Sequence, residues 1–203
     1  MPRKVAADLP TMRTEIDATN IALEVDEQAA PLVGATLGWD GNLPALEDRA
    51  RQLALGRLRA QVTRDHLNRQ LDPDCLDFLS DLRHLVKGDR NHPDYVLHVS
   101  VSPSAFVRVD FYTQVREVKR WIALDHALLA PYKARLTRVV ARAEALEGVE
   151  AELEKTARAL QVDIEAEAVA LTAKRDDLHR LLGEHAKTHG LERGWGDGFF
   201  LRG

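Results

Sequence analysis

The sequence predicts a mainly α-helical protein with a minor α+β part, and three observations predict it. Residues 132–182 hold no proline and a single glycine, Gly148, and their apolar residues recur with heptad spacing. Residues 44–71 also show helical spacing, whereas residues 95–112 alternate apolar and polar side chains as strands do. We therefore expect a small α+β domain over 1–112, a long helical coiled-coil arm over 113–189 and a glycine-rich aromatic tail over 190–203.

The composition and charge of the chain argue against some classes of function. The 203 residues are 45% hydrophobic and 30% charged, which is ordinary for a folded globular protein. A net charge of −4 argues against a surface built as a whole for nucleic acid or an anionic membrane. Residues 1–8 lack the apolar core of a secretory signal, and no run of 18 uncharged apolar residues occurs. The expected location is the cytoplasm, without membrane contact.

The N-terminal part is expected to combine one strand with two helices. Residues 20–26 alternate with period two and indicate a strand, whereas Pro44 followed by acidic residues indicates the start of a helix over about 44–71. This helix has a second apolar face, formed by Leu55, Leu58 and Val62, so we expect neighbours on both of its sides.

A shorter helix and a β-hairpin are expected next. Asp72-Pro73-Asp74 is typical of a helix start, and Lys87-Gly88 of a helix end, so a helix is predicted over about 73–87. The alternation over about 95–112 predicts a β-hairpin, which needs a third strand or packed helices for stability. Strand 20–26 is the expected third strand of a small antiparallel sheet.

The arm begins with a helix that Thr113 can cap and that runs to Pro131. Its heptad core positions beyond that proline are Leu136, Val139, Ala143, Leu146, Glu150, Leu153, Ala157, Leu160, Ile164, Glu167, Leu171, Lys174, Leu178 and Leu181. A helix of this length with one apolar face requires a partner helix.

Two arrangements of the arm are compatible with the sequence. In a helical hairpin that turns at Gly148, the basic residues 133–142 would lie against the acidic residues 144–154. In a continuous rod that pairs between subunits, Gly148 would cost only about 1 kcal/mol relative to alanine. The hairpin is favoured because the segments on either side of Gly148 are nearly equal in length.

The aromatic tail supplies the candidate interaction residues. Trp195, Phe199 and Phe200 concentrate apolar area in a segment whose glycines preclude a stable helix. These side chains are expected either to fold back or to dock on a neighbour, since aromatic anchors commonly dominate interface energies.

Enzyme and metal signatures are weak. His179, His185, His189 and Asp176 have spacings that resemble those of metal-binding bundles, but the required second motif is lacking, and solvated histidines explain them better. Asp65-His66 and Asp125-His126 form no local dyad, because adjacent helix residues point about 100° apart. Cys75 lies between aspartates, which disfavour a thiolate, so it is interpreted as structural. We expect no cofactor and no enzymatic activity.

Nucleic-acid binding is the alternative function. The arm carries arginines that could contact phosphates, namely Arg116, Arg120, Arg135, Arg138 and Arg142. Acidic residues close in sequence explain most of these charges as internal pairs. The leading hypothesis is a non-enzymatic interaction or assembly protein that acts through its helices, by self-association or with a protein partner; a metal-dependent bundle enzyme is the third.

Overall fold

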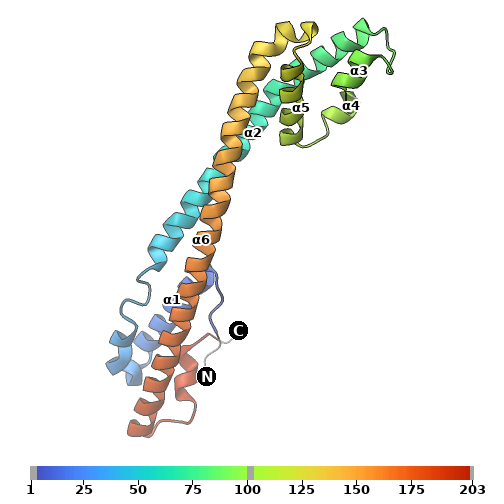
Figure 1. Cartoon of the computed structure of the whole chain (residues 1–203). Coiled ribbons are helices and arrows are strands. Elements are labelled where there is room, and N and C mark those ends of the chain that lie inside the picture. The colour runs from blue at the N-terminus through green and yellow to red at the C-terminus, as the bar shows by residue number, and fades with distance from the viewer. Residues whose placement is uncertain (1–3, 100–102, 202–203) are drawn as a thin grey trace. The chain divides into compact units, whose positions relative to one another are not determined.

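The computed structural model describes residues 4–99 and 103–201, and this part of the chain contains helices and no strand. The elements in order are α1 (Leu9–Val25), η1 (Glu27–Thr36), α2 (Leu43–Leu85), α3 (Pro93–His98), α4 (Pro103–Phe106), α5 (Phe111–Leu124), η2 (Ala127–Leu129), α6 (Ala130–His189) and η3 (Trp195–Phe199) (Figure 1). The mainly helical prediction is confirmed. Within the described residues, none of these helices combines the length and apolar character that crossing a bilayer requires.

The chain divides into two compact units. Unit 1 comprises Met1–Ala54 and Lys155–Gly203, and unit 2 comprises Leu55–Glu154. Each unit has its own apolar core. Helices α2 and α6 each contribute one segment to unit 1 and another segment to unit 2.

The predicted strand over 20–26 is wrong, because these residues form the last turns of α1. The buried residues of α1 are Met12, Ile16, Thr19 and Leu23, which have helical spacing. Ile21 and Val25, which created the period of two, are 58% and 76% exposed. An Asp8 cap, whose side chain accepts a hydrogen bond from the backbone N–H of Thr11, starts the helix.

The predicted β-hairpin over 95–112, and with it the three-stranded sheet, is also wrong. Its described residues lie in α3, α4, the start of α5 and the non-helical residues 99 and 107–110, while residues 100–102 fall outside the described part. His92 and Asp110 cap α3 and α5 by accepting hydrogen bonds from the N–H groups of Asp94 and Thr113, so Asp110, not Thr113, is the cap of α5. Side-chain caps of this kind favour helix starts over strands.

Helix α2 runs through Pro73, so the two helices predicted at 44–71 and 73–87 are one. Proline inside a helix costs about 3 kcal/mol. This cost is offset by a continuous buried face on which Leu71, Cys75, Phe78 and Leu79 are at most 1% exposed. The predicted end is close to the observed one: Gly88 has a positive φ, and its N–H bonds the carbonyl of Arg83.

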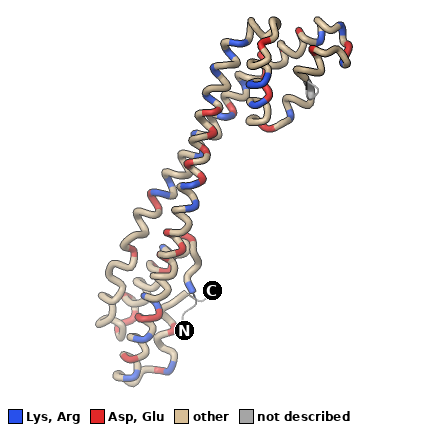
Figure 2. Tube along the Cα trace, in the orientation of Figure 1, with Lys and Arg blue, Asp and Glu red and all other residues tan. Residues whose placement is uncertain are grey.

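Helix α6 runs without interruption through Gly148, so the predicted hairpin turn is wrong. The pairing partner of α6 in each unit is α2, antiparallel to it (Figure 1). In unit 2 Arg57 pairs with Glu154 at 2.8 Å and Arg135 with Asp74 at 2.6 Å. Both signs of charge alternate along the two helices (Figure 2). Charges of α6 in unit 2 are thus paired with α2 and also with α5, since Glu144 pairs with Lys119, and Lys133 with Asp125 at the end of α5.

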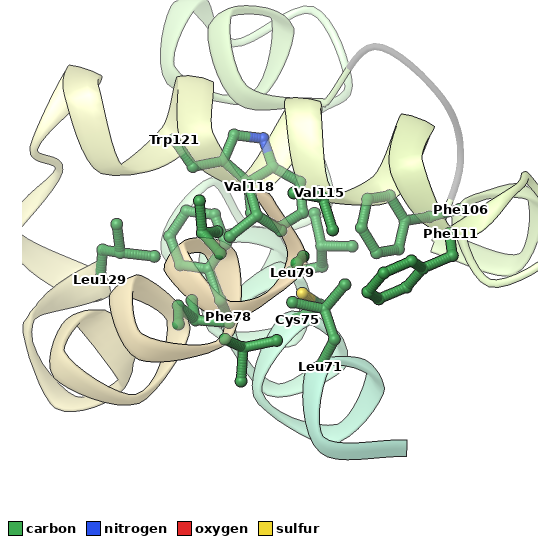
Figure 3. Close-up of a cluster of buried hydrophobic side chains, with 14 of the residues drawn as sticks. Leu71, Cys75, Phe78, Leu79, Phe106, Phe111, Val115, Val118, Trp121 and Leu129 are labelled. Atoms are coloured by element: carbon green, nitrogen blue, oxygen red, sulfur yellow. The ribbon is translucent and has the colours of Figure 1, made fainter. Parts of the chain in front are cut away.

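Aromatic side chains fill the core of unit 2 (Figure 3). The Trp121 indole stacks on Phe106 with ring centroids 5.1 Å apart and donates its N–H to the carbonyl of His98 at 2.6 Å. These contacts join α3 and α4 to α5 and hold the short helices without any strand pairing.

Candidate interaction surface

The buried side of α6 in unit 1 determines which side faces outward. Leu160, Ile164, Leu171 and Leu178 are buried, as the heptad predicts. Beyond Leu160, the buried residues at the second core position are Ala168, Arg175 and Leu182, each one residue after the predicted Glu167, Lys174 and Leu181. A straight helix drifts in this way relative to a strict heptad.

The opposite side of the same segment is apolar but exposed. Val162 and Val169 are 63% and 71% exposed, although valine is usually buried. They lie about 180° around the helix from the buried residues. Four exposed alanines extend this side, and we call the set the α6 outer face: Ala159, Val162, Ala166, Val169, Ala170 and Ala173.

A groove runs along one edge of the α6 outer face. The N-terminal segment lies beside α6, where the Val5 N–H donates to Thr172 Oγ1 at 3.1 Å. The groove between them has a volume of about 450 Å³ and is mainly apolar. Its lining includes Val5, Ala7, Val169 and Ala173, with Lys4, Glu165 and Asp176 contributing charge. An apolar side chain from a partner would fit such a space better than a charged one.

The two ends of the α6 outer face carry opposite charge. Lys155 and Arg158 lie at its N-terminal end, and Asp176 and Asp177 at its C-terminal end. Between them Glu165 is the nearest charge to the middle, and it accepts a hydrogen bond from Gln161 at 2.9 Å. The face is therefore an apolar stripe with a basic end and an acidic end.

Unit 2 has a second exposed apolar stripe, on α2. Leu55, Leu58 and Val62 are 41%, 55% and 56% exposed, and they form the second apolar face that the sequence showed. The neighbour expected there is not supplied by the described part of the chain in unit 2. Arg59 and Arg69 flank this stripe, and Arg69 bonds the Asp65 carbonyl of its own helix.

The tail residues fold back onto unit 1. Phe199 and Phe200 are 5% and 7% exposed, and Trp195 is half-buried. The Trp195 indole N–H donates to Asp26 Oδ2 at 3.0 Å, and the Phe200 ring lies 5.1 Å from the Arg175 guanidinium. Folding back accounts for the apolar area of both phenylalanines; a docking role for the tail stays a prediction.

The metal candidates do not converge. His179 bonds Asp197 at 2.7 Å, and His185 bonds the carbonyl of Gln28 at 2.8 Å. His189 stacks on His185, while Asp176 lies at the groove. No group of three or more potential metal ligands occurs among residues 4–99 and 103–201.

The candidate phosphate-binding arginines are partly engaged within unit 2. Arg135 makes a bidentate pair with Asp74, and Arg120 bonds Glu117 and the carbonyls of Leu97 and His98. Arg116 bonds Thr113 at 2.7 Å, and Arg142 contacts Gln70 at 3.5 Å, whereas Arg138 is exposed. These contacts reduce the charge available to phosphates. Nucleic-acid binding stays a prediction.

The side chains of Cys75 and His126, which were considered as catalytic groups, are engaged in packing and helix capping. Cys75 is fully buried, and burial, reinforced by Asp72 and Asp74, raises the pKa of its thiol far above the usual range. His126 Nδ1 accepts a hydrogen bond from the Leu128 N–H and so starts η2. His126 also packs edge-on against the His98 ring, with centroids 5.0 Å apart. A buried thiol and a capping imidazole do not form a nucleophile and base.

The α6 outer face was not among the sites predicted from the sequence. The signal was present, since apolar residues recur at 159, 162, 166, 169 and 173, on the side opposite the heptad core. It was overlooked because alanine in a helix is usually explained by helix propensity alone. No known protein family, curated protein or solved structure matches the chain, so the surface is interpreted from its own residues.

Proposed function

We propose that the protein is a non-enzymatic interaction protein that docks a helix of a protein partner on the α6 outer face. One observation carries the proposal: Val162 and Val169 are exposed on the side of α6 opposite its buried residues. An apolar stripe at helical spacing is what helix-on-helix recognition uses.

The surroundings of the face support the same function. The groove beside Val169 offers further apolar area, and the charged ends provide orientation. Charges at the rim of an interface contribute more to orientation and association rate than to affinity. Shape and charge therefore both favour an elongated, amphipathic partner.

Site-specific photo-crosslinking tests the proposal. A photoreactive amino acid at Val162 in the full chain should form covalent protein adducts in cells, because a docked helix would lie within a few ångströms. The same probe at Val107, a valine in the turn after α4 that is 37% exposed, is the control. The adduct should disappear when Val169→Glu is added, since a buried unpaired carboxylate opposes docking. Equal adduct yields at both positions would refute the proposal.

A further inference from the structure

We infer that the helix bound by the α6 outer face is the same segment of a second copy, packed antiparallel about a two-fold axis between Glu165 and Ala166. This inference rests on the proposed function and names its partner. A two-fold contact uses one surface twice, so the surface must be complementary to itself. Both the apolar residues and the charges of this face meet that condition.

The apolar residues match themselves under reversal. A two-fold axis midway along the face places Val162 of one copy opposite Val169 of the other, and the reverse contact occurs on the other side of the axis. Both valines are more exposed than buried in the single chain. Ala159, Ala166 and Ala173 have small side chains that let two helices approach closely, so the valines can fill the space between the backbones.

The charges select the antiparallel direction. Reversal places Lys155 and Arg158 of one copy beside Asp176 and Asp177 of the other, and it does so twice. A parallel pair would place like charges together at both ends, which is unfavourable. Arg180, just beyond the acidic end, lies 3.0 Å from Glu184 and 3.9 Å from Asp177 of its own helix, and Asp176 and Asp177 together still outweigh its charge.

One charge opposes the pairing. Glu165 lies next to the axis, so the two copies of this side chain come close to each other on the same edge of the interface. Its hydrogen bond from Gln161 holds it on the α6 surface without neutralising it. Removing the charge should therefore strengthen association, which a purely structural role of Glu165 would not predict.

The α6 outer face consists of six small or medium-sized side chains, whereas a stable interface buries about 800 Å² of surface per partner. We therefore expect a reversible dimer with a dissociation constant on the order of micromolar. Ala7, which is exposed on the groove wall, adds area beside Val169 and increases the apolar contact.

Sedimentation velocity on the full chain across a concentration series tests the inference. Wild type should shift from monomer to dimer, and Val162→Glu should weaken association by about tenfold or more, equivalent to at least 1.4 kcal/mol. Leu58→Glu, on the exposed α2 stripe, is the matched control and should leave association unchanged. Glu165→Gln should tighten the dimer.

Charge exchange makes the test specific. The variant Lys155→Glu with Arg158→Glu, and the variant Asp176→Lys with Asp177→Lys, should each stay monomeric alone. Mixing the two should restore a dimer, since one copy then presents acidic ends and the other basic ends. Circular dichroism of each variant shows whether it is folded.

Two results would overturn the inference: a wild-type monomer at all concentrations, or association that Leu58→Glu abolishes and Val162→Glu does not. The experiments distinguish a failure of self-pairing from a failure of the proposed function. If the Val162 crosslink captures a different protein while the chain sediments as a monomer, the proposed function stands and self-pairing is wrong. If the crosslink gives no adduct and the chain is monomeric, both are wrong.

Discussion

Arg175 Nη2 lies 3.1 Å from Glu15 Oε2 inside unit 1, and the arginine side chain is only 1% exposed. The guanidinium also lies 5.1 Å from the Phe200 ring. This pair joins α6, α1 and the tail through one buried charge. A buried cation is tolerated only with a counter-charge close to it, so the three elements depend on one another.

Removing the carboxylate should therefore destabilise the protein strongly. We expect Glu15→Ala to lower the free energy of unfolding by about 3–5 kcal/mol, because it removes the carboxylate that faces the buried guanidinium of Arg175. Replacing both partners with apolar residues, Glu15→Leu with Arg175→Met, should recover most of this loss. Urea titrations give these values, and a Glu15→Ala change below about 0.5 kcal/mol would show that the pair is not buried in solution.

The same arginine shows how far the sequence could predict the fold. The heptad pattern identified α6 and its core, but its strict period placed Lys174 in the core where Arg175 is found. The one-residue shift follows from the drift of a straight helix relative to a strict heptad, and Arg175 is buried by its contact with Glu15 of α1, which lies far away in the chain. Local spacing cannot contain that information.

The strand errors have a related cause. Residues 20–26 alternate with period two, yet α1 buries only Leu23 of the three apolar residues that set the alternation. Short runs of valine, isoleucine and leucine are ambiguous until caps or packing decide between helix and strand. Ile21 and Val25, the exposed apolar residues that caused the error, could be recognised as exposed only once the buried side of α1 was known.

Gly148 provides a direct test of the continuous helix. Its position on α6 is open, with no atom within 4 Å of an added Cβ. Gly148→Ala should stabilise the protein by about 1 kcal/mol, since alanine favours a helix interior. Thermal unfolding measures the change. Gly56→Ala is the contrasting variant: its Cβ would lie 2.7 Å from Leu153 Cδ2, so this crowding should remove the gain. Destabilisation by Gly148→Ala would indicate a turn there.

Cys75 should make stability depend on alkaline pH. Burial raises the pKa of its thiol, so above about pH 8.5 the thiol ionises in the unfolded chain but not in the folded one. Its contribution to stability is thus complete at neutral pH and falls by up to about 1.4 kcal/mol per pH unit above that point. Urea titrations between pH 7 and 10 should show this slope.

The matched variant for that measurement is Cys75→Ala, which lowers stability at every pH but removes the thiol from the titration. Its unfolding free energy should fall less steeply between pH 8.5 and 10 than that of wild type. Tyr112, whose pKa is raised by burial and by its hydrogen bond to Glu150, contributes the same sign in both proteins and cancels in the comparison. Identical slopes would show that the thiol is accessible to water.

The tail should behave as part of the core of unit 1. Phe200 is 7% exposed and packs against Arg175 and His179, so Phe200→Ala should lower the free energy of unfolding by about 3–5 kcal/mol. Leu201 is the next residue but is 43% exposed, and Leu201→Ala should change stability by less than about 0.5 kcal/mol. Urea titrations of both variants measure the difference. Equal effects would mean that the tail is free of the core and available to bind another protein.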